Sequence, residues 1–339
     1  MDESTLVLVQ VVFRHGIRAP DHLVSYPGDP YQNVKFEPFG RGQLTKNGRK
    51  QCYEFGKELR DRYNSFLGAE YYDSLLEAHS SEVGRARTTL QLVLAGLFPP
   101  TKTTRITEDL NWHPIPFNYQ RITKDPLFGP MILQVTNNKN HSEFKKSQNS
   151  IEVVKHVEGK LNWKIDHASQ LTMIYDIIKS QLDLGLELPE WIADIYPKKI
   201  EQEISTYLTE NMARKDYLKD GIGYLMQKIL SEMEAKVENL KGDSPKIILY
   251  SGHDINVVAL MQILKFPELI WPLYIGSLTF ELHKVNDEFY VKIIFIDGYL
   301  HESEKEERIL NLQTLKVLNS DDEAWKLPQL RKHVEMYLK

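Results

Sequence analysis

The sequence predicts an α/β protein: a mixed, mostly parallel sheet flanked by helices, with an inserted, mostly helical cap domain. Two nearly unbroken apolar runs, residues 5–13 (TLVLVQVVF) and 246–250 (KIILY), are typical of strands buried on both faces of a parallel sheet. The chain between them has few β-branched runs and many Lys and Glu residues. We therefore expect a discontinuous core domain, residues 1–100 and 242–339, and a helical cap domain, residues 101–241.

The first hundred residues alternate between the two kinds of element. After the first strand and a stretch rich in Pro and Gly, residues 45–67 carry apolar side chains at helical spacing. Residues 75–79 predict a short strand. Residues 85–97 predict a second helix, which Pro99 and Pro100 end.

The rest of the chain supplies the remaining elements. Helical patterns occupy residues 170–182 and 220–240, within the expected cap. A further helix follows the second apolar strand and extends to about residue 264. Residues 277–283 and 289–295 then alternate on either side of a polar turn, which predicts a hairpin at the sheet edge.

Composition excludes several classes of protein. The 339 residues are 42% hydrophobic and 26% charged, as in ordinary globular proteins. The formal net charge of −5 argues against a nucleic-acid partner, since affinity for phosphate backbones comes from clustered Lys and Arg. No apolar run approaches the roughly 20 residues of a membrane-spanning helix, so no membrane span is expected.

The signals for localisation conflict. The N-terminus, Met-Asp-Glu-Ser, lacks the basic and apolar regions of a signal peptide. Cys52 is the only cysteine, so no intrachain disulfide can form, which favours a reducing, cytoplasmic compartment. Asn140, in an Asn-His-Ser sequon, points instead to the secretory pathway. We expect Cys52 itself to be inert packing, because it falls on the apolar stripe of its helix.

The strongest chemical signal is the segment Arg14-His15-Gly16-Ile17-Arg18-Ala19-Pro20, directly after the first strand. Ligands of open α/β sheets bind beyond the carboxyl ends of the strands. Two guanidiniums four residues apart can bind different oxygens of one phosphate, and Gly16 allows the backbone to approach closely. This segment therefore predicts an anion site.

Two other segments follow strands in the same way. Ser251-Gly252-His253-Asp254 comes directly after the second apolar strand. Residues 80–85 follow the short strand and bring Arg85. Two histidine-containing loops at the ends of buried strands suggest one shared pocket, to which Arg85 adds a third guanidinium.

These segments resemble the histidine acid phosphatase family, branch 2 of the histidine phosphatase superfamily. Its signature, Arg-His-Gly-x-Arg-x-Pro, is matched from Arg14 to Pro20, and its distal His-Asp pair at His253-Asp254. Further similarity follows in family order at residues 42–51, 81–85, 97–100 and 112–116. The chain looks most similar to the prostatic, lysosomal and insect venom or salivary acid phosphatases.

The resemblance implies a role for each residue. His15 would attack phosphorus to give a phosphohistidine, Asp254 would protonate the leaving alcohol, and the phosphoryl oxygens would be held by Arg14, Arg18, Arg85 and His253. It implies no metal or other cofactor, small phosphate monoesters as substrates, and a secreted or lysosomal location. Because an ordinary Asp titrates near ~3.9, we expect activity to be highest at acidic pH. Whether the chain forms a homodimer stays open.

Departures from the family pattern motivate an alternative. Ile17, Ala19, Gly84 and the pair Ile255-Asn256 stand where the family usually has other residues. The alternative is a catalytically weak or inactive secreted protein that sequesters a biogenic amine or lipid mediator between core and cap. Candidates for lining such a pocket are Ile17, Trp112, Phe117, Tyr119 and Tyr175, although aromatic residues of a cap are also typical of its core. A phytase-like activity is disfavoured, since inositol phosphates need a more basic cap.

Overall fold

The computed structural model describes residues 3–21, 25–137, 148–166, 168–207, 213–239, 244–266, 269–298 and 324–339. Asn140, the residue of the predicted sequon, lies outside these ranges. No helix of the described chain is both long enough and apolar enough to cross a membrane.

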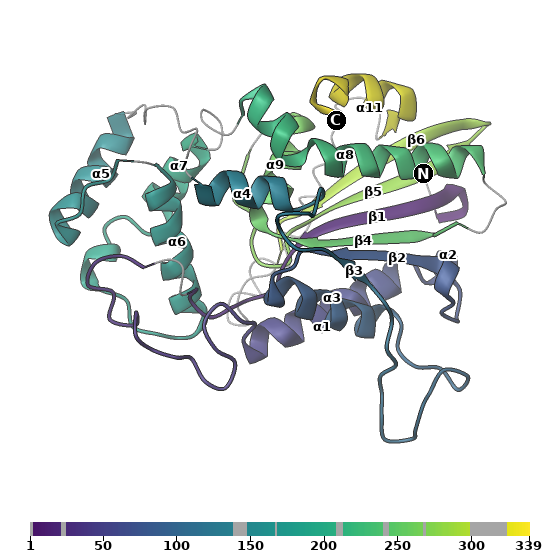
Figure 1. The fold of residues 1–339 in the computed structure, drawn as a ribbon, viewed down its shortest axis with the longest axis horizontal. Helices are drawn as coiled ribbons and strands as arrows, with labels where there is room; N and C mark the ends of the chain where they lie inside the picture. Colours follow the sequence, from purple (N-terminus) through teal and green to yellow (C-terminus); the bar gives the residue numbers. More distant parts are fainter. Residues whose placement is uncertain are drawn as a thin grey trace.

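The described strands form one mixed sheet, which confirms the predicted α/β class (Figure 1). Its strands are, in spatial order, β3 (Asn118–Tyr119), β2 (Leu76–Ser80), β4 (Ile247–Gly252), β1 (Leu6–Arg14), β5 (Ser277–Val285), β6 (Glu288–Ile296) and β7 (Trp325–Lys326). The first four run parallel to one another, whereas β5, β6 and β7 are joined in antiparallel fashion. The carboxyl ends of β1, β2 and β4 therefore lie side by side at the same end of the sheet.

The two apolar runs of the sequence are the central strands. All of β4 is buried, and so is β1 except at Val7. Side chains of β1 alternate between two cores: Val9 and Val11 pack on one face of the sheet, and Leu8 and Val12 on the other. Burial on both faces explains why these strands read as continuous apolar runs.

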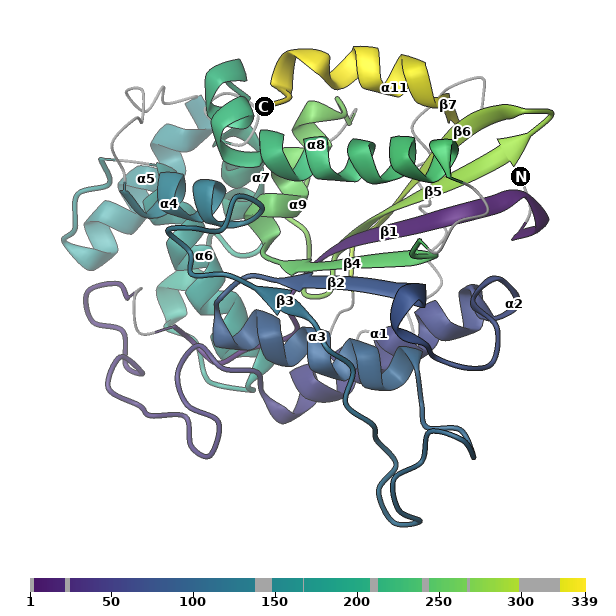
Figure 2. The same ribbon diagram turned by 45° about the vertical axis from the view of Figure 1, so that its right-hand side comes forward.

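Helices cover both faces of the sheet. One face carries α1 (Lys46–Arg62) and α3 (Gly84–Leu97), which pack against each other (Figure 2). The other face carries α4 (Gly129–Asn137), α8 (Lys215–Glu238), α9 (Asp254–Ile263) and α11 (Leu327–Val334). The short helix α2 (Asn64–Leu67) follows α1.

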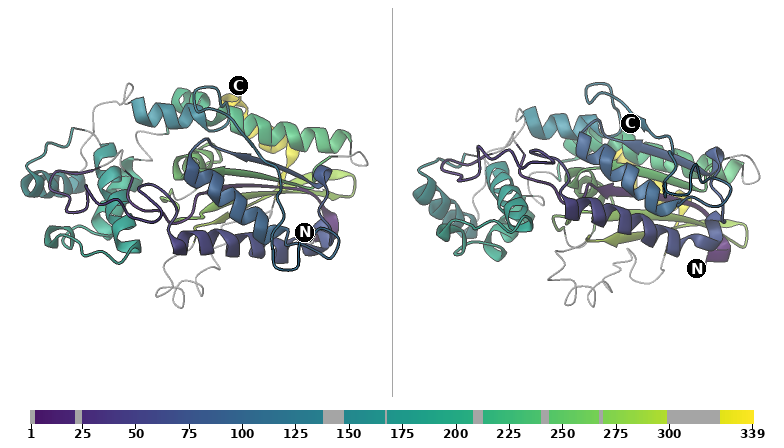
Figure 3. Two further views of the ribbon diagram at one scale, coloured as in Figure 1. Left: turned by 60° about the horizontal axis from the view of Figure 1, so that its bottom comes forward. Right: turned by 90° about the horizontal axis from the view of Figure 1, so that it is seen from below.

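A second group of helices stands beyond the carboxyl ends of the parallel strands. It consists of α5 (Gln148–Leu161), α6 (Ala168–Asp183) and α7 (Lys198–Tyr207), and Figure 3 shows it to one side of the sheet. The helical patterns predicted at residues 170–182 and 220–240 correspond to α6 and α8. Three elements from residues 101–241, the predicted cap, belong with the sheet: β3 pairs with it, and α4 and α8 lie over it. The division of the chain into a core domain and a cap domain stays a prediction.

The hairpin forms as predicted, but not at the sheet edge. Asn286 and Asp287 join β5 to β6 in left-handed conformation, with φ of 49° and 62°, as in a two-residue primed turn. The expectation of an edge position was wrong, because β7 pairs with β6 through Tyr290 and Val291. A strand of two residues is too short to leave a periodic signal in the sequence.

Candidate active site

The signature loop, residues 14–20, starts where β1 ends, and its first two residues are hydrogen-bonded to neighbouring segments of the chain. The backbone N–H of Arg14 donates to Gly276 O (2.9 Å) and that of His15 to Gly252 O (3.2 Å). At Gly16, a Cβ atom would lie 2.5 Å from Cys52 Sγ and 2.8 Å from Gly48 O. Only glycine allows helix α1 to pack this closely against the loop.

The second histidine loop starts where the neighbouring strand β4 ends. The backbone N–H of His253 donates to Asn256 Oδ1 (3.0 Å), which fixes the first turn of α9. His253 Nε2 is 2.9 Å from Ser81 Oγ, in the loop that follows β2. Asp254 is the first residue of α9, next to this imidazole.

The two imidazoles lie together, with ring centroids 5.5 Å apart. Nδ1 of His15 is 2.9 Å from the carbonyl oxygen of Gly16, an acceptor, so Nδ1 carries the proton and Nε2 the lone pair. Burial lowers the pKa of His15 well below its ordinary value, and Arg85, then Arg14, lower it further. His15 is therefore a neutral imidazole with a nucleophilic Nε2.

Arg85, at the start of α3, contacts that nitrogen. Its Nε–H donates to His15 Nε2 (2.9 Å), and its Nη1 donates to Asp21 Oδ2 (2.9 Å). Burial lowers the pKa of Arg85, and the nearby Arg18 lowers it further. The structure thus brings the third predicted guanidinium to the nucleophile.

Arg14 and Arg18 are held mainly by carboxylates. Arg14 Nη2 pairs with Asp254 Oδ2 (2.9 Å) and Asp176 Oδ1 (3.3 Å), while Arg18 Nη2 pairs with Asp176 Oδ2. Burial opposes the charge of Arg14, but Asp254, Tyr274 and Asp176 together raise its pKa. The Nε–H groups of both arginines are buried and lack a partner among the described residues. Buried donors are rarely left without a partner, so both are candidates for binding an anion.

Three contributors were not found from the sequence. Asp176 lies in the middle of α6, more than 150 positions from both arginines, and a single polar residue on an amphipathic helix gives no signal. Tyr274 precedes β5; its ring lies 4.2 Å below the guanidinium of Arg14, and its buried hydroxyl has no partner among the described residues. Asp21, which binds Arg85, comes directly after the signature.

The structure does not gather the residues predicted to line a substrate pocket. Ile17 is a buried residue of the signature loop itself, and Phe117 packs against the core under α1 and α3. Trp112 is 42% exposed and adjoins His113, which contacts Tyr71 at the amino-terminal end of β2, away from His15.

The remaining two candidates lie nearer to the catalytic loops. Tyr119 pairs with Ser80 at the end of β2 and is exposed, with Arg87 over its ring at 4.8 Å. Tyr175 is buried among the cap helices, where its hydroxyl donates to Glu201 Oε1 (2.9 Å). Cys52 is buried, and burial raises its pKa to about 12, as expected for an inert thiol.

The arrangement suits an anion and a nucleophilic attack on it. Three guanidiniums and two imidazoles converge from the ends of β1, β2 and β4, and the carboxylates of Asp21, Asp176 and Asp254 pair with the guanidiniums. Within the part of the chain that the structure describes, no three His, Cys, Asp or Glu side chains are grouped to hold a metal ion.

Comparison with known proteins gives one consistent result. Residues 5–167 and 190–296 match the model of the histidine phosphatase superfamily (branch 2). The venom acid phosphatase of Apis mellifera is 33% identical over 315 residues, covering 89% of this chain and 80% of that protein. The lysosomal acid phosphatase of Rattus norvegicus is 30% identical over 308 residues, covering 86% of this chain and 70% of that protein.

Solved structures share the fold at lower identity. The phytase from Citrobacter braakii superposes with a TM-score of 0.68 at 17% sequence identity, covering 99% of this chain and 98% of that one. At such identity the likeness concerns the fold alone.

Proposed function

Because the chain belongs to the histidine phosphatase superfamily (branch 2), we propose that it is an acid phosphatase that hydrolyses small phosphate monoesters through a phosphohistidine at His15. Relatives named acid phosphatases, among them those of venom and lysosome, support this activity. The observation that carries the proposal is the lone pair of His15 Nε2 facing Arg85; Arg14 and Arg18 each keep a buried Nε–H donor without a partner among the described residues.

In the first step, the phosphoryl group takes up the free donors of Arg14 and Arg18 and draws Arg85 from the imidazole. Nε2 of His15 attacks phosphorus while the bond to the ester oxygen breaks. The protonated form of Asp254 gives its proton to the leaving alcohol. The guanidiniums gathered in the site stabilise the charge of the transition state, which is usually the largest single contribution in such a site.

In the second step, water replaces the alcohol. The carboxylate of Asp254 accepts a proton from the water as its oxygen attacks phosphorus, and the bond from phosphorus to Nε2 breaks. Inorganic phosphate leaves, and His15 is again a neutral imidazole, its Nδ1–H still bound to Gly16 O. Hydrolysis is complete with no other reactant than water.

The alternative of an inactive, ligand-sequestering protein is not favoured. Of the departures that motivated it, Asn256 still fixes the backbone of His253, and the backbone N–H of Ile17 donates to Gln51 Oε1 (3.2 Å). At Gly84 a Cβ atom would approach Gln43 Oε1 to 3.1 Å, so a small residue fits there. None of these changes removes a reacting group.

The test is hydrolysis of p-nitrophenyl phosphate across pH, followed by alkaline quenching, under which phosphohistidine is stable and can be isolated. We expect activity highest at acidic pH and an acid-labile phosphoryl label that His15→Ala abolishes. Asp254→Asn should slow the first step while leaving the site able to bind phosphate. His156→Ala, on the distant helix α5, is the matched control and should turn over normally. A wild-type protein without turnover at any pH would exclude the proposed function.

A secreted or lysosomal location is part of the same proposal, and it is supported by the venom and lysosomal relatives. Fractionation of the cells that express the full-length protein would test it. Recovery in the cytosolic fraction alone would exclude this location.

A further inference from the structure

A pocket of about 340 Å³ lies at the other end of the sheet from His15, and we propose that it binds small organic monocarboxylates. Its volume is within the range of small-molecule sites. The lining residues come from the end of α1, the α2 turn and the segment after α3: Arg60, Asn64, Ser65, Gly68, Ala69, Tyr71, Phe98, Pro99, Pro100, Thr101, Thr104 and His113. The proposed phosphatase reaction uses none of them.

The helices show that this pocket is separate from the catalytic site. Helix α1 begins beside the signature loop, where Gly48 contacts Ile17, and reaches the pocket at Arg60, ~18 Å farther along its axis. Helix α3 likewise starts next to Arg85 and ends just before Phe98, a wall of the pocket. A ligand bound here cannot touch His15.

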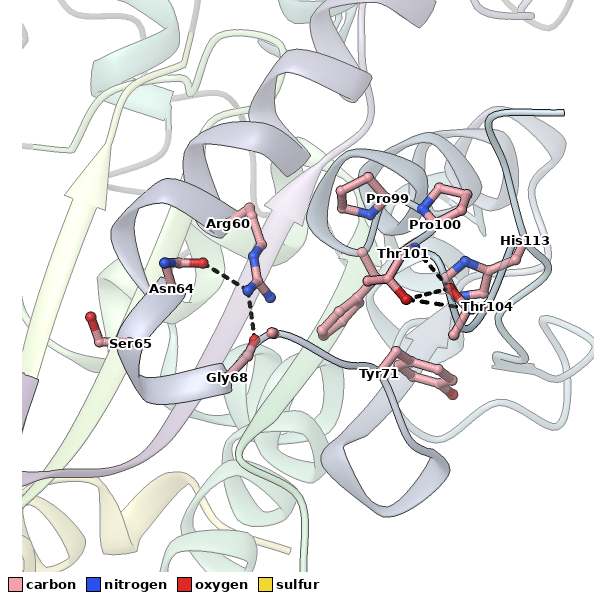
Figure 4. Close-up of a pocket in the computed structure, with 12 residues that line it drawn as sticks. Arg60, Asn64, Ser65, Gly68, Tyr71, Pro99, Pro100, Thr101, Thr104 and His113 are labelled. Atoms are coloured by element: carbon pink, nitrogen blue, oxygen red, sulfur yellow. Dashed lines mark hydrogen bonds between the residues drawn. The ribbon is translucent and has the colours of Figure 1, made fainter. Parts of the chain in front are cut away.

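The pocket offers one cation. Nη2 of Arg60 donates to Asn64 Oδ1 (2.7 Å) and to the carbonyl oxygen of Gly68 (2.6 Å), both of them neutral groups (Figure 4). These two bonds fix the guanidinium, and among the described residues no carboxylate pairs with it. Its Nε and Nη1 hydrogens are left for a ligand.

The pocket also holds a buried imidazole without a hydrogen-bond partner. His113 is only 9% exposed, yet neither ring nitrogen has a partner among the described residues. Its ring packs on Tyr71, with centroids 5.8 Å apart, and Figure 4 places it across the pocket from Arg60. Burial lowers the pKa of His113, so the neutral ring offers one donor and one acceptor. Native proteins rarely leave such groups unsatisfied, and a polar ligand would satisfy this one.

The charge and the walls define the ligand. One guanidinium beside a neutral imidazole balances a single negative charge, and the planar fork of Arg60 matches a carboxylate. Glu70 accepts a hydrogen bond from Oγ1 of the lining residue Thr101 (2.7 Å), and its negative charge repels a dianionic phosphate more strongly than a monoanion. Apolar walls come from Phe98 and Pro99. A carboxylate on a flat apolar body fits these features.

Calorimetric titration of the whole protein with benzoate tests the proposal, with benzyl alcohol as the neutral analogue. We expect saturable benzoate binding that inorganic phosphate does not displace, and much weaker binding of benzyl alcohol. Arg60→Gln should weaken benzoate binding about tenfold or more, as expected for loss of a charge-assisted bond. His113→Phe, which keeps the ring packing, should weaken it severalfold. Lys57→Gln, which removes one charge from the same helix outside the pocket, is the matched control.

Several results would overturn this inference. They are absence of benzoate binding, equal affinity for benzyl alcohol, displacement by phosphate, and unchanged affinity in Arg60→Gln. Thermal unfolding of each variant, compared with the wild type, separates lost binding from lost folding. Because none of these readouts depends on turnover, failure of the phosphatase proposal would leave the test intact.

Discussion

The Nε–H of Arg85 donates a hydrogen bond to Nε2 of His15 across 2.9 Å, so a cation covers the proposed nucleophile when no phosphate is bound. Asp21 binds the other side of the same guanidinium and keeps it in place. A phosphoryl group offers Arg85 charged oxygens, which are stronger acceptors than a neutral imidazole. Substrate binding and exposure of the lone pair are therefore coupled through one side chain.

Removing this guanidinium should change both rate and titration. In Arg85→Gln we expect kcat/KM to fall about 10²-fold to 10³-fold, as when a fixed donor to a transition state is lost. After burial, Arg85 is the largest cause of the lowered pKa of His15, so that pKa should rise. More His15 is then protonated at a given acidic pH, and the acidic limb of the kcat/KM profile should move to higher pH. The profile measures both effects.

The neighbouring Arg87, whose guanidinium lies over Tyr119, provides the control. Arg87→Gln removes the same charge from the same helix and should leave the acidic limb in place. If the acidic limb of the kcat/KM profile stays in place in Arg85→Gln, Arg85 has no electrostatic effect on His15.

The two buried imidazoles should make stability depend on pH. Burial, then Arg85 and Arg14, lowers the pKa of both His15 and His253, so below about pH 6.5 the unfolded chain binds more protons than the folded one. The free energy of unfolding should therefore fall as pH decreases from about 6.5, by up to ~1.4 kcal/mol per pH unit for each histidine. Urea unfolding at several pH values measures this slope. His253→Gln should reduce it, and an identical slope in that variant would contradict the assignment.

The sequence predicted the fold well where local pattern and burial agree. Of the two predicted runs, residues 6–13 lie in β1 and residues 247–250 in β4, because strands covered on both faces are apolar throughout. The pattern could not show that β7 covers the hairpin, because its two residues pair with β6 only through the tertiary fold.

The site was predictable where its residues follow strands. Arg14, His15 and His253 meet because β1 and β4 are parallel neighbours, and the sequence places each residue just at or after a strand. Asp176 could not be predicted, since its position depends on how α6 stands against the sheet. The position of Trp112, which is 42% exposed and adjoins His113, likewise could not be predicted, because aromatic character does not reveal where in the tertiary fold a side chain lies.

Asp176 should compete with phosphate for the arginines. Its two oxygens occupy Arg14 and Arg18, and its charge repels an incoming phosphoryl group. Asp176→Asn keeps the shape and removes the charge, so the inhibition constant of inorganic phosphate should decrease by about threefold to tenfold. Competition kinetics measures this constant. Asp216→Asn, in the exposed first turn of α8, is the control. Weaker phosphate binding in Asp176→Asn would instead mean that the carboxylate is needed to hold the arginines in position.

Gly16 tests how strictly the signature loop depends on contact with α1. A methyl group there would lie 2.5 Å from Cys52 Sγ and 2.8 Å from the backbone oxygen of Gly48, and the backbone atom cannot move without shifting the helix. Gly16→Ala should lower the free energy of unfolding by about 1–3 kcal/mol, as in other overpacked cores, and displace His15 enough to reduce kcat. Gly159→Ala, in α5, where the added carbon would meet no atom within 4 Å apart from its chain neighbours and the backbone of its own helix, should instead stabilise the protein by up to about 1 kcal/mol. Both variants replace glycine by alanine. If denaturant unfolding shows that the free energy of unfolding falls in Gly16→Ala and rises in Gly159→Ala, the steric effect at Gly16 is separated from the helix propensity of alanine. Equal stabilisation of both variants would show that the signature loop can move away from α1 without lowering the free energy of unfolding.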